Sequence, residues 1–281
     1  MNRLRKMPMK NFWTYFILVL LGSTMIVPFI AMVSQSLKPG SQVLEYPFRW
    51  IPENPSMENY RMLFKQNPIM RWTLNSFIVA GGSTILQLIT CSLAAYAFAR
   101  TSFPGKDILF WMMMSMLIIP SQTTLVPLFL LFSKLNLTNT YTALLLPTAS
   151  SAFGIFLLKQ FMEPIPKDYD EAASLDGCTR FQFYSKILLP MCKPALAVLA
   201  TFNFVTQWND FLYPLIMTQT RDMFTLQIGL SALQASGSRG EMGGMGVVMA
   251  GAVWGFIPTF ILFLLLQKYL VEGVSSAGIK G

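Results

Sequence analysis

The stretch of sequence from Lys167 to Pro190 reads KDYDEAASLDGCTRFQFYSKILLP. Its start carries three carboxylates, which would oppose the positive end of a helix dipole: Asp168, Asp170 and Glu171. Gly177 follows a short apolar face, and glycine readily takes the left-handed conformation that ends a helix. Thr179 is a suitable N-cap for a second, amphipathic helix, which we expect to end at Pro190. The stretch therefore predicts a short helix, a glycine turn and a second helix.

Long apolar stretches surround this predicted helix pair. They are free of charge except for Asp210: residues 11–37, 72–99, 108–133, 135–158, 194–220 and 242–267. A membrane-spanning helix needs about 20 mostly apolar residues, so we expect an all-α integral membrane protein with six transmembrane helices. The third stretch contains Pro120 and a polar run after it. We expect its membrane part to end near Ile119 and the remainder to be re-entrant or to line a water-filled space.

The composition excludes several classes of protein. Of 281 residues, 53% are hydrophobic and 12% are charged, whereas a soluble domain carries about 25% charged residues. The chain has no histidine, and its three cysteines lack metal-ligand or disulfide spacing. A histidine-dependent enzyme and a metalloenzyme are therefore excluded. The net charge of +8 is typical of basic loops beside a membrane, and the scattered basic residues lack a nucleic-acid-binding pattern.

An even number of spans places both termini on the same side of the membrane. Basic residues precede the first span and predict a cytoplasmic N-terminus: Arg3, Arg5, Lys6 and Lys10. The loop 159–193 is then cytoplasmic, as is the C-terminus. We expect three regions: residues 1–71 with the first span and an extracytoplasmic loop, a five-helix core over residues 72–271, and a C-terminal tail over residues 272–281.

The loop 159–193 resembles a known motif. Glu171, Ala172 and Ala173, then Gly177, then Ile187, Leu189 and Pro190 match the spacing E-A-A-x-x-x-G-x(9)-I-x-L-P. This spacing resembles the EAA loop of permease subunits of ATP-binding-cassette (ABC) importers, and it implies the MetI-like permease fold of type I importers. By that resemblance the loop docks in a cleft of an ATPase subunit, through Glu171, Ala172, Ala173, Leu175, Asp176, Gly177, Ile187 and Pro190. Glu171 would make polar contacts, the two alanines would pack into the cleft, and Gly177 would permit the turn.

Two further segments resemble the carbohydrate branch of this family. Residues 208–215, WNDFLYPL, and the C-terminal residues 273–281, GVSSAGIKG, are similar to runs in sugar-importer permeases. The chain thus resembles the second permease of maltose-type importers. The resemblance implies a bacterial inner-membrane subunit that pairs with a second homologous permease, an ATPase dimer and an extracytoplasmic solute-binding protein to import a carbohydrate. The chain itself would bind no cofactor. It has no phosphate-binding loop motif, so ATP and magnesium would bind the ATPase.

Two groups of residues are candidates for the solute pathway and for contact with a binding protein. Asp210 is the one carboxylate inside a span, and its neighbours Gln207, Trp208 and Asn209 offer hydrogen bonds and an aromatic face that suit a sugar. A buried polar cluster between helices explains them equally well, and the resemblance implies that the other permease holds most of the sugar. In the loop 219–245, the resemblance implies a contact with the binding protein through Leu226, Gln227, Ile228, Gly229 and Leu230, and the alternative is a flexible linker.

Two other classes of function remain open as alternatives. A stand-alone secondary transporter or channel would need coupling charges inside the membrane, where the sequence offers only Asp210. An intramembrane enzyme without histidine would need a serine–lysine pair, and the lysines all lie in loops or at span ends. The sequence therefore favours a non-enzymatic permease subunit.

Overall fold

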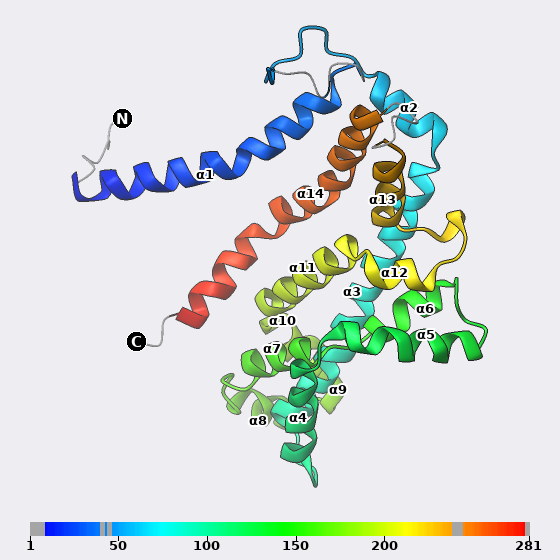
Figure 1. The fold of residues 1–281 in the computed structure, drawn as a ribbon. Coiled ribbons are helices and arrows are strands. Elements are labelled where there is room, and N and C mark those ends of the chain that lie inside the picture. Colours follow the sequence, from blue (N-terminus) through cyan, green and yellow to red (C-terminus); the bar gives the residue numbers. More distant parts are fainter. Residues whose placement is uncertain (1–8, 40–42, 44–46, 238–243, 279–281) are drawn as a thin grey trace. The chain divides into compact units, whose positions relative to one another are not determined.

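The computed structural model describes residues 9–39, 43, 47–237 and 244–278, and every regular element within these ranges is helical (Figure 1). The basic residues Arg3, Arg5 and Lys6 and the last three residues of the C-terminal motif lie outside them. The chain divides into two compact units. One comprises residues 1–68 and 230–256, and the other comprises residues 69–229 and 257–281.

The first unit contains α1 (Met9–Ser36) and α2 (Glu58–Gln66), with the second half of α13 (Leu226–Gly237) and the start of α14 (Gly244–Gly278). Asn59 of α2 donates hydrogen bonds to the carbonyl oxygens of Ser36 and Lys38, at 2.8 and 2.7 Å. These bonds tie α2 to the end of α1. The apolar side chains of α1 are mostly exposed, as expected for a helix in contact with lipid or with another subunit.

The second unit is built around α3 (Ile69–Arg100), which packs against α7 (Ala152–Met162) and α11 (Lys193–Asn209). It also holds the second part of α14. Its short helices are α4 (Lys106–Ser115), α5 (Leu125–Lys134), α6 (Tyr141–Leu145), α8 (Asp168–Leu175), α9 (Arg180–Phe183), α10 (Leu189–Met191) and α12 (Leu212–Met217). Single 3-10 turns lie at Met116–Ile118, Ser121–Thr124, Leu146–Thr148 and Arg221–Met223. The last helix, α14, continues to Gly278, so residues 272–278 of the expected tail are helical.

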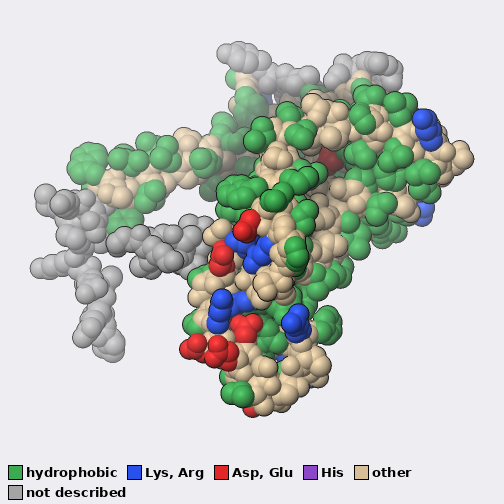
Figure 2. All heavy atoms as spheres, turned by 90° about the horizontal axis from the view of Figure 1, so that it is seen from below, with side chains coloured by type: hydrophobic (Ala, Val, Ile, Leu, Met, Phe, Trp, Pro, Cys, Tyr) green, Lys and Arg blue, Asp and Glu red, His purple; other side chains and the backbone are tan. Residues whose placement is uncertain are grey.

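Three helices are long and apolar enough to cross a membrane: residues 12–36, 69–100 and 244–268. Three further pairs of helical segments pass the same test but are bent by 96°, 43° and 78°, which gives up to six spans. The 96° bend separates Lys106–Ile118 from Ser121–Lys134, so the expected break near Ile119 is confirmed. The expected stretch 194–220 is divided, because α11 ends at Asn209 and Asp210 is extended. Figure 2 shows hydrophobic side chains over much of the visible face, with most of the visible charged side chains gathered in one region and a few basic ones apart from it.

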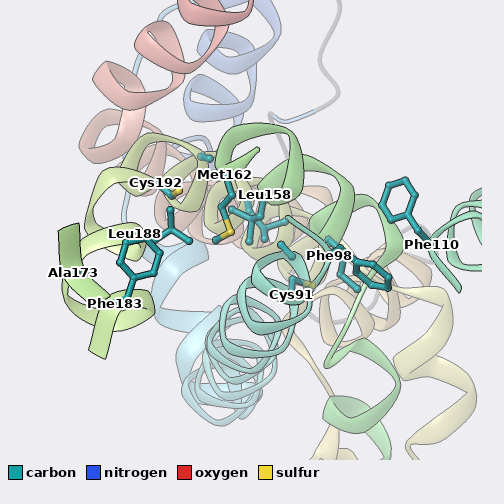
Figure 3. Packing of buried hydrophobic residues seen from close by; sticks show 13 residues of the cluster. Cys91, Phe98, Phe110, Leu158, Met162, Ala173, Phe183, Leu188 and Cys192 are labelled. Carbon is teal, nitrogen blue, oxygen red and sulfur yellow. The ribbon is translucent and has the colours of Figure 1, made fainter. Parts of the chain in front are cut away.

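A buried apolar cluster joins α3, α7 and α11 to the loop 159–193. Its members include Cys91, Phe98, Leu158, Ala173, Phe183 and Leu188 (Figure 3). Gly154 of α7 makes this packing possible. A Cβ atom there would lie 3.0 Å from the sulfur of Cys91 and 3.1 Å from Leu199 Cδ1. The three helices therefore approach closely where a side chain is absent.

Candidate functional site

The first helix of the loop 159–193 ends in a glycine turn, as expected. α8 begins with the predicted carboxylates in its first turn and ends at Leu175. Gly177 has a φ of +75°. Its amide donates to the carbonyl of Ser174 at 3.1 Å, and the amide of Cys178 donates to the carbonyl of Ala173 at 2.9 Å. This pattern satisfies the last carbonyls of the helix and reverses the chain within a few residues.

The second helix begins at the predicted cap but does not end at Pro190. The hydroxyl of Thr179 accepts from the amide of Gln182, and the side chain of Gln182 accepts from the amide of Thr179. The helix then widens into a π-turn at Tyr184–Leu188, continues through Pro190 to Met191, and meets α11 at a bend of 78°. The proline is tolerated because the wider turn relieves its clash with the preceding carbonyls.

Buried polar contacts anchor this loop to α3. The side chain of Arg100, which is 3% exposed, donates to the carbonyls of Met162 and Ile165 at 2.9 and 2.6 Å. It also forms an ion pair of 3.2 Å with Asp170 of α8. On the second helix, the hydroxyls of Tyr184 and Ser92 are hydrogen-bonded at 2.7 Å. Both helices of the loop are thus held by side chains of one long helix.

The residues assigned to coupling lie on different faces. Ala173 is 3% exposed and packs within the apolar cluster, and Ile187 is partly buried against it. Ala173 is already covered by its own chain, whereas Ala172 is exposed, so Ala172 is the one of the two alanines that is free to face a partner. Leu175 is 89% exposed. The other exposed members of the set are Glu171, Ala172, Asp176, Gly177 and Pro190.

A second site lies where three helical segments are interrupted. A pocket of about 350 Å³, called the polar pocket below, is lined from the 3-10 turn after Pro120, the break between α6 and α7, and the junction of α11 and α12. Its polar lining residues are Ser121, Gln122, Thr124, Thr148, Thr206, Gln207, Asp210 and Tyr213. Its apolar lining residues are Leu125, Leu128, Pro147 and Leu212. The pocket is thus a hollow built on broken helices, in which polar groups lie on a lining surface that is mostly apolar.

Hydrogen bonds hold the wall of the polar pocket in place. Asn203, buried on α11, donates to the hydroxyls of Ser83 and Thr84 at 3.3 and 3.1 Å. The hydroxyl of Ser83 donates to that of Thr148, a lining residue, at 2.7 Å. Polar side chains between membrane helices are stabilised by such bonds, because lipid offers no alternative partner. The network connects the pocket to the middle of α3.

Asp210 and Tyr213 fix the backbone at the N-terminus of α12. The carboxylate of Asp210 accepts a hydrogen bond of 3.4 Å from the amide of Tyr213, and the hydroxyl of Tyr213 donates to the carbonyl of Ala143 at 2.6 Å. Asp210 therefore caps a helix and lines the polar pocket at the same time. Within the described ranges, no three acidic, cysteine or histidine side chains lie close enough together to hold a metal ion.

Residues 87–276 match the family model described as the binding-protein-dependent transport system inner membrane component. This chain belongs to that family. The match covers most of the second unit, including the loop 159–193 and all the residues named above as lining the polar pocket. The predicted family and the MetI-like permease fold are confirmed.

Individual relatives extend the similarity to nearly the whole permease. The arabinooligosaccharide transport permease of Bacillus subtilis is 32% identical over 94% of this chain and 93% of its own. The sulfoquinovosyl glycerol transport permease of Agrobacterium fabrum is 34% identical over 90% and 88%. A crystal structure of a bacterial ABC transporter that imports the acidic polysaccharide alginate has a chain with the same fold, with a TM-score of 0.81, 22% identity, and coverage of 93% and 98%.

Two of the four expected pathway residues, Trp208 and Asn209, lie outside the lining of the polar pocket in this permease. Trp208 is 1% exposed, with its ring 4.8 Å from that of Phe77 and stacked 5.8 Å from that of Phe204. It cannot offer a face to a sugar, because neighbouring aromatic rings already cover it. Asn209 is exposed outside the pocket lining and donates to the carbonyl of Val205. Gln207 and Asp210 line the polar pocket, so these two remain candidates.

The segment assigned to the binding protein is largely buried. Leu226 and Ile228 are buried. A Cβ on Gly229 would lie 2.0 Å from Cε3 of Trp72. These three positions therefore serve internal packing, and only Gln227 and Leu230 are partly exposed. Residues 226–237 form the helix α13 and so are not a flexible linker, while residues 238–243 lie outside the described ranges.

Two residues that hold these sites in place were not among the predicted site residues: Arg100 for the loop 159–193 and Asn203 for the polar pocket. Arg100 reads as an ordinary basic residue at the end of a span, and its partners lie 62 to 70 positions further along the chain. Asn203 could have been predicted, because a polar amide within an apolar stretch is itself a signal of a buried partner. The hydroxyl residues of the polar pocket gave no such signal, since serine and threonine are common in membrane helices.

Proposed function

We propose that this chain is one of two permease subunits of an ATP-driven, binding-protein-dependent carbohydrate importer. Full-length similarity to an oligosaccharide permease supports the substrate class. The alginate importer, which has a structure in complex with a substrate-bound periplasmic protein, supports an extracytoplasmic partner. In this proposal ATP and magnesium bind a separate ATPase dimer, both termini are cytoplasmic, and this chain catalyses no reaction.

The observation that carries the proposal is the exposed apolar stripe on α8. Tyr169, Ala172 and Leu175 follow one another at three-residue spacing and are all exposed, so they lie on one side of the helix. A leucine that is 89% exposed on a short helix with three carboxylates in its first turn is typical of a contact with another protein. The opposite side of α8 is fixed through Ala173 and Asp170. The stripe thus projects from a firmly held base, as docking to an ATPase requires.

The proposal is tested by purifying the tagged chain in mild detergent from its native membrane and identifying the proteins that accompany it. We expect an ATPase and a second permease, and ATP-dependent uptake of an oligosaccharide by vesicles that contain the complex. Leu175→Arg should keep the second permease but reduce recovery of the ATPase. A central interface side chain contributes about 2 kcal/mol, which is roughly a 30-fold loss of affinity.

A matched control is Ile51→Arg, because Ile51 is 82% exposed in a segment that the proposal places outside the cell. It should leave recovery of the ATPase unchanged. Gly177→Arg should reach the membrane but abolish uptake, because the backbone at φ +75° disfavours any side chain. Normal ATPase recovery with Leu175→Arg, or normal uptake with Gly177→Arg, would contradict the coupling role. Recovery of the chain alone, with ATP-independent uptake, would favour a secondary transporter.

A further inference from the structure

We infer that the polar pocket is a binding subsite of this chain for a neutral, polyhydroxylated solute, and that it disfavours acidic ones. The inference rests on the proposed function and specifies its substrate class. The relatives do not decide between a neutral and an acidic solute, since their names include both an arabinooligosaccharide and a sulfonate-bearing solute. The chemistry of the pocket decides it.

The pocket offers many neutral hydrogen-bonding groups. Its lining includes the hydroxyls of serine, threonine and tyrosine and the amides of Gln122 and Gln207. Hydroxyls and amides both donate and accept, which matches the hydroxyls of a sugar without demanding one charge state. Leucine and proline side chains on the same walls can cover the C–H faces of a sugar ring. A pocket of about 350 Å³ lies within the usual range for small-molecule sites.

The charge of the pocket argues against an acidic solute. Among its described lining residues, Asp210 is the charged one, and neither lysine nor arginine is present. Sites for carboxylates, sulfonates and phosphates normally supply arginine, lysine or clustered amide donors. Here an anion would meet a carboxylate of the same sign, which repels it. The hydroxyls of a neutral sugar, in contrast, can donate to that carboxylate.

The structural role of Asp210 must be separated from its charge. Its carboxylate caps α12 through the amide of Tyr213, and this bond alone would explain an acidic residue here. Asparagine has similar size and also caps helices well. Asp210→Asn therefore keeps the cap and removes the charge, so any change in charge preference reports on the pocket.

The experiment uses the complete complex with Thr206→Cys as a reporter, since Thr206 is exposed on α11 and lines the pocket. Cys91 and Cys192 are buried, and Cys178 is replaced by serine. The thiol is modified with methanethiosulfonate reagents that carry an ammonium or a sulfonate group, and labelling of this chain is followed by mass spectrometry. Each rate is divided by the rate for a small thiol in solution.

We expect the ammonium reagent to react about 10-fold faster than the sulfonate reagent. This ratio is expected when one unit charge, here that of Asp210, lies a few ångström from the thiol in a largely aqueous site. With Asp210→Asn the ratio should fall to near 1. A neutral arabino- or maltotrisaccharide should slow the labelling, and a trigalacturonate should not. Thr123→Cys, on the turn Ser121–Thr124 that lines the pocket but itself outside the lining, should not be protected by either sugar.

A ratio that Asp210→Asn leaves unchanged, or equal protection by the acidic trisaccharide, would overturn the inference. A complex that imports a carbohydrate but shows no protection at Thr206→Cys would also overturn it, while the proposed function would stand. A complex that imports no carbohydrate with its binding protein present would instead overturn the proposed function.

Discussion

Replacing Arg100 by methionine should release α8 from α3. Methionine has similar length but cannot donate to the carbonyls of Met162 and Ile165 or pair with Asp170. Because the side chain of Arg100 is 3% exposed, water cannot easily replace the lost donors at the carbonyls. The end of α7 and the start of α8 would therefore lose a shared anchor.

The expected magnitude follows from the burial of the two partners. Breaking a buried ion pair costs about 3–5 kcal/mol. Asp170 is 31% exposed and can regain water, so the lower end of that range, about 3 kcal/mol, applies to Arg100→Met. Asp170→Asn keeps an acceptor and leaves Arg100 with two carbonyl partners, so about 1–2 kcal/mol is expected. Because the two side chains share one interaction, the double variant should cost less than the sum.

The assay is hydrogen exchange of the purified complex, followed in peptides that cover residues 168–191. A local loss of about 3 kcal/mol corresponds to roughly 150-fold faster exchange for amides protected by α8. Arg180→Met, at an exposed arginine of the same loop, should leave this exchange unchanged. The reasoning is refuted if Arg100→Met exchanges like the wild type, or if the effects of the two single variants add fully.

Three other substitutions test the packing and the cap. Gly229→Ala should lower the thermal midpoint of the complex, because its Cβ would lie 2.0 Å from the buried ring of Trp72. Such overpacking costs about 1–3 kcal/mol. The control Gly22→Ala, with open space around its Cβ, should not lower the midpoint. Thr179→Ala should cost about 1 kcal/mol and speed exchange at residues 180–183, and unchanged exchange would show that the cap is dispensable. Asn203→Ala should cost about 1–3 kcal/mol in the thermal midpoint, and an unshifted midpoint would show that its two hydrogen bonds contribute nothing.

Local rules predicted the loop 159–193 well. The left-handed conformation of Gly177 and the cap at Thr179 depend on residues within four positions of each other, so the sequence contains the whole cause. The break before Pro120 was predictable for the same reason, because proline prevents the preceding residue from continuing a helix. The extension of the second helix past Pro190 was not, since it depends on a π-turn that single-residue preferences do not specify.

Contacts between distant segments decided the positions that were misassigned. Trp208 has the chemistry of a sugar platform, but the aromatic rings of Phe77 and Phe204 cover it. The inward position of Ala173 depends on a cluster drawn from six α-helices and the π-turn. In an apolar chain the usual contrast between hydrophobic inside and polar outside is absent, so hydropathy does not show which face of a helix is covered.

The length of α3 has a mechanical consequence. This helix has 32 residues and contains no proline, so it is about 48 Å long, against a hydrocarbon core of about 30 Å. Ser83 and Arg100 are about 26 Å apart along it. This one helix thus connects the hydroxyl of Ser83, which holds the wall of the polar pocket, to the guanidinium of Arg100, which holds α8. A displacement of α8 by a fraction of a helical turn would be passed through Arg100 to α3. Any tilt or slide of α3 would then change the shape of the polar pocket.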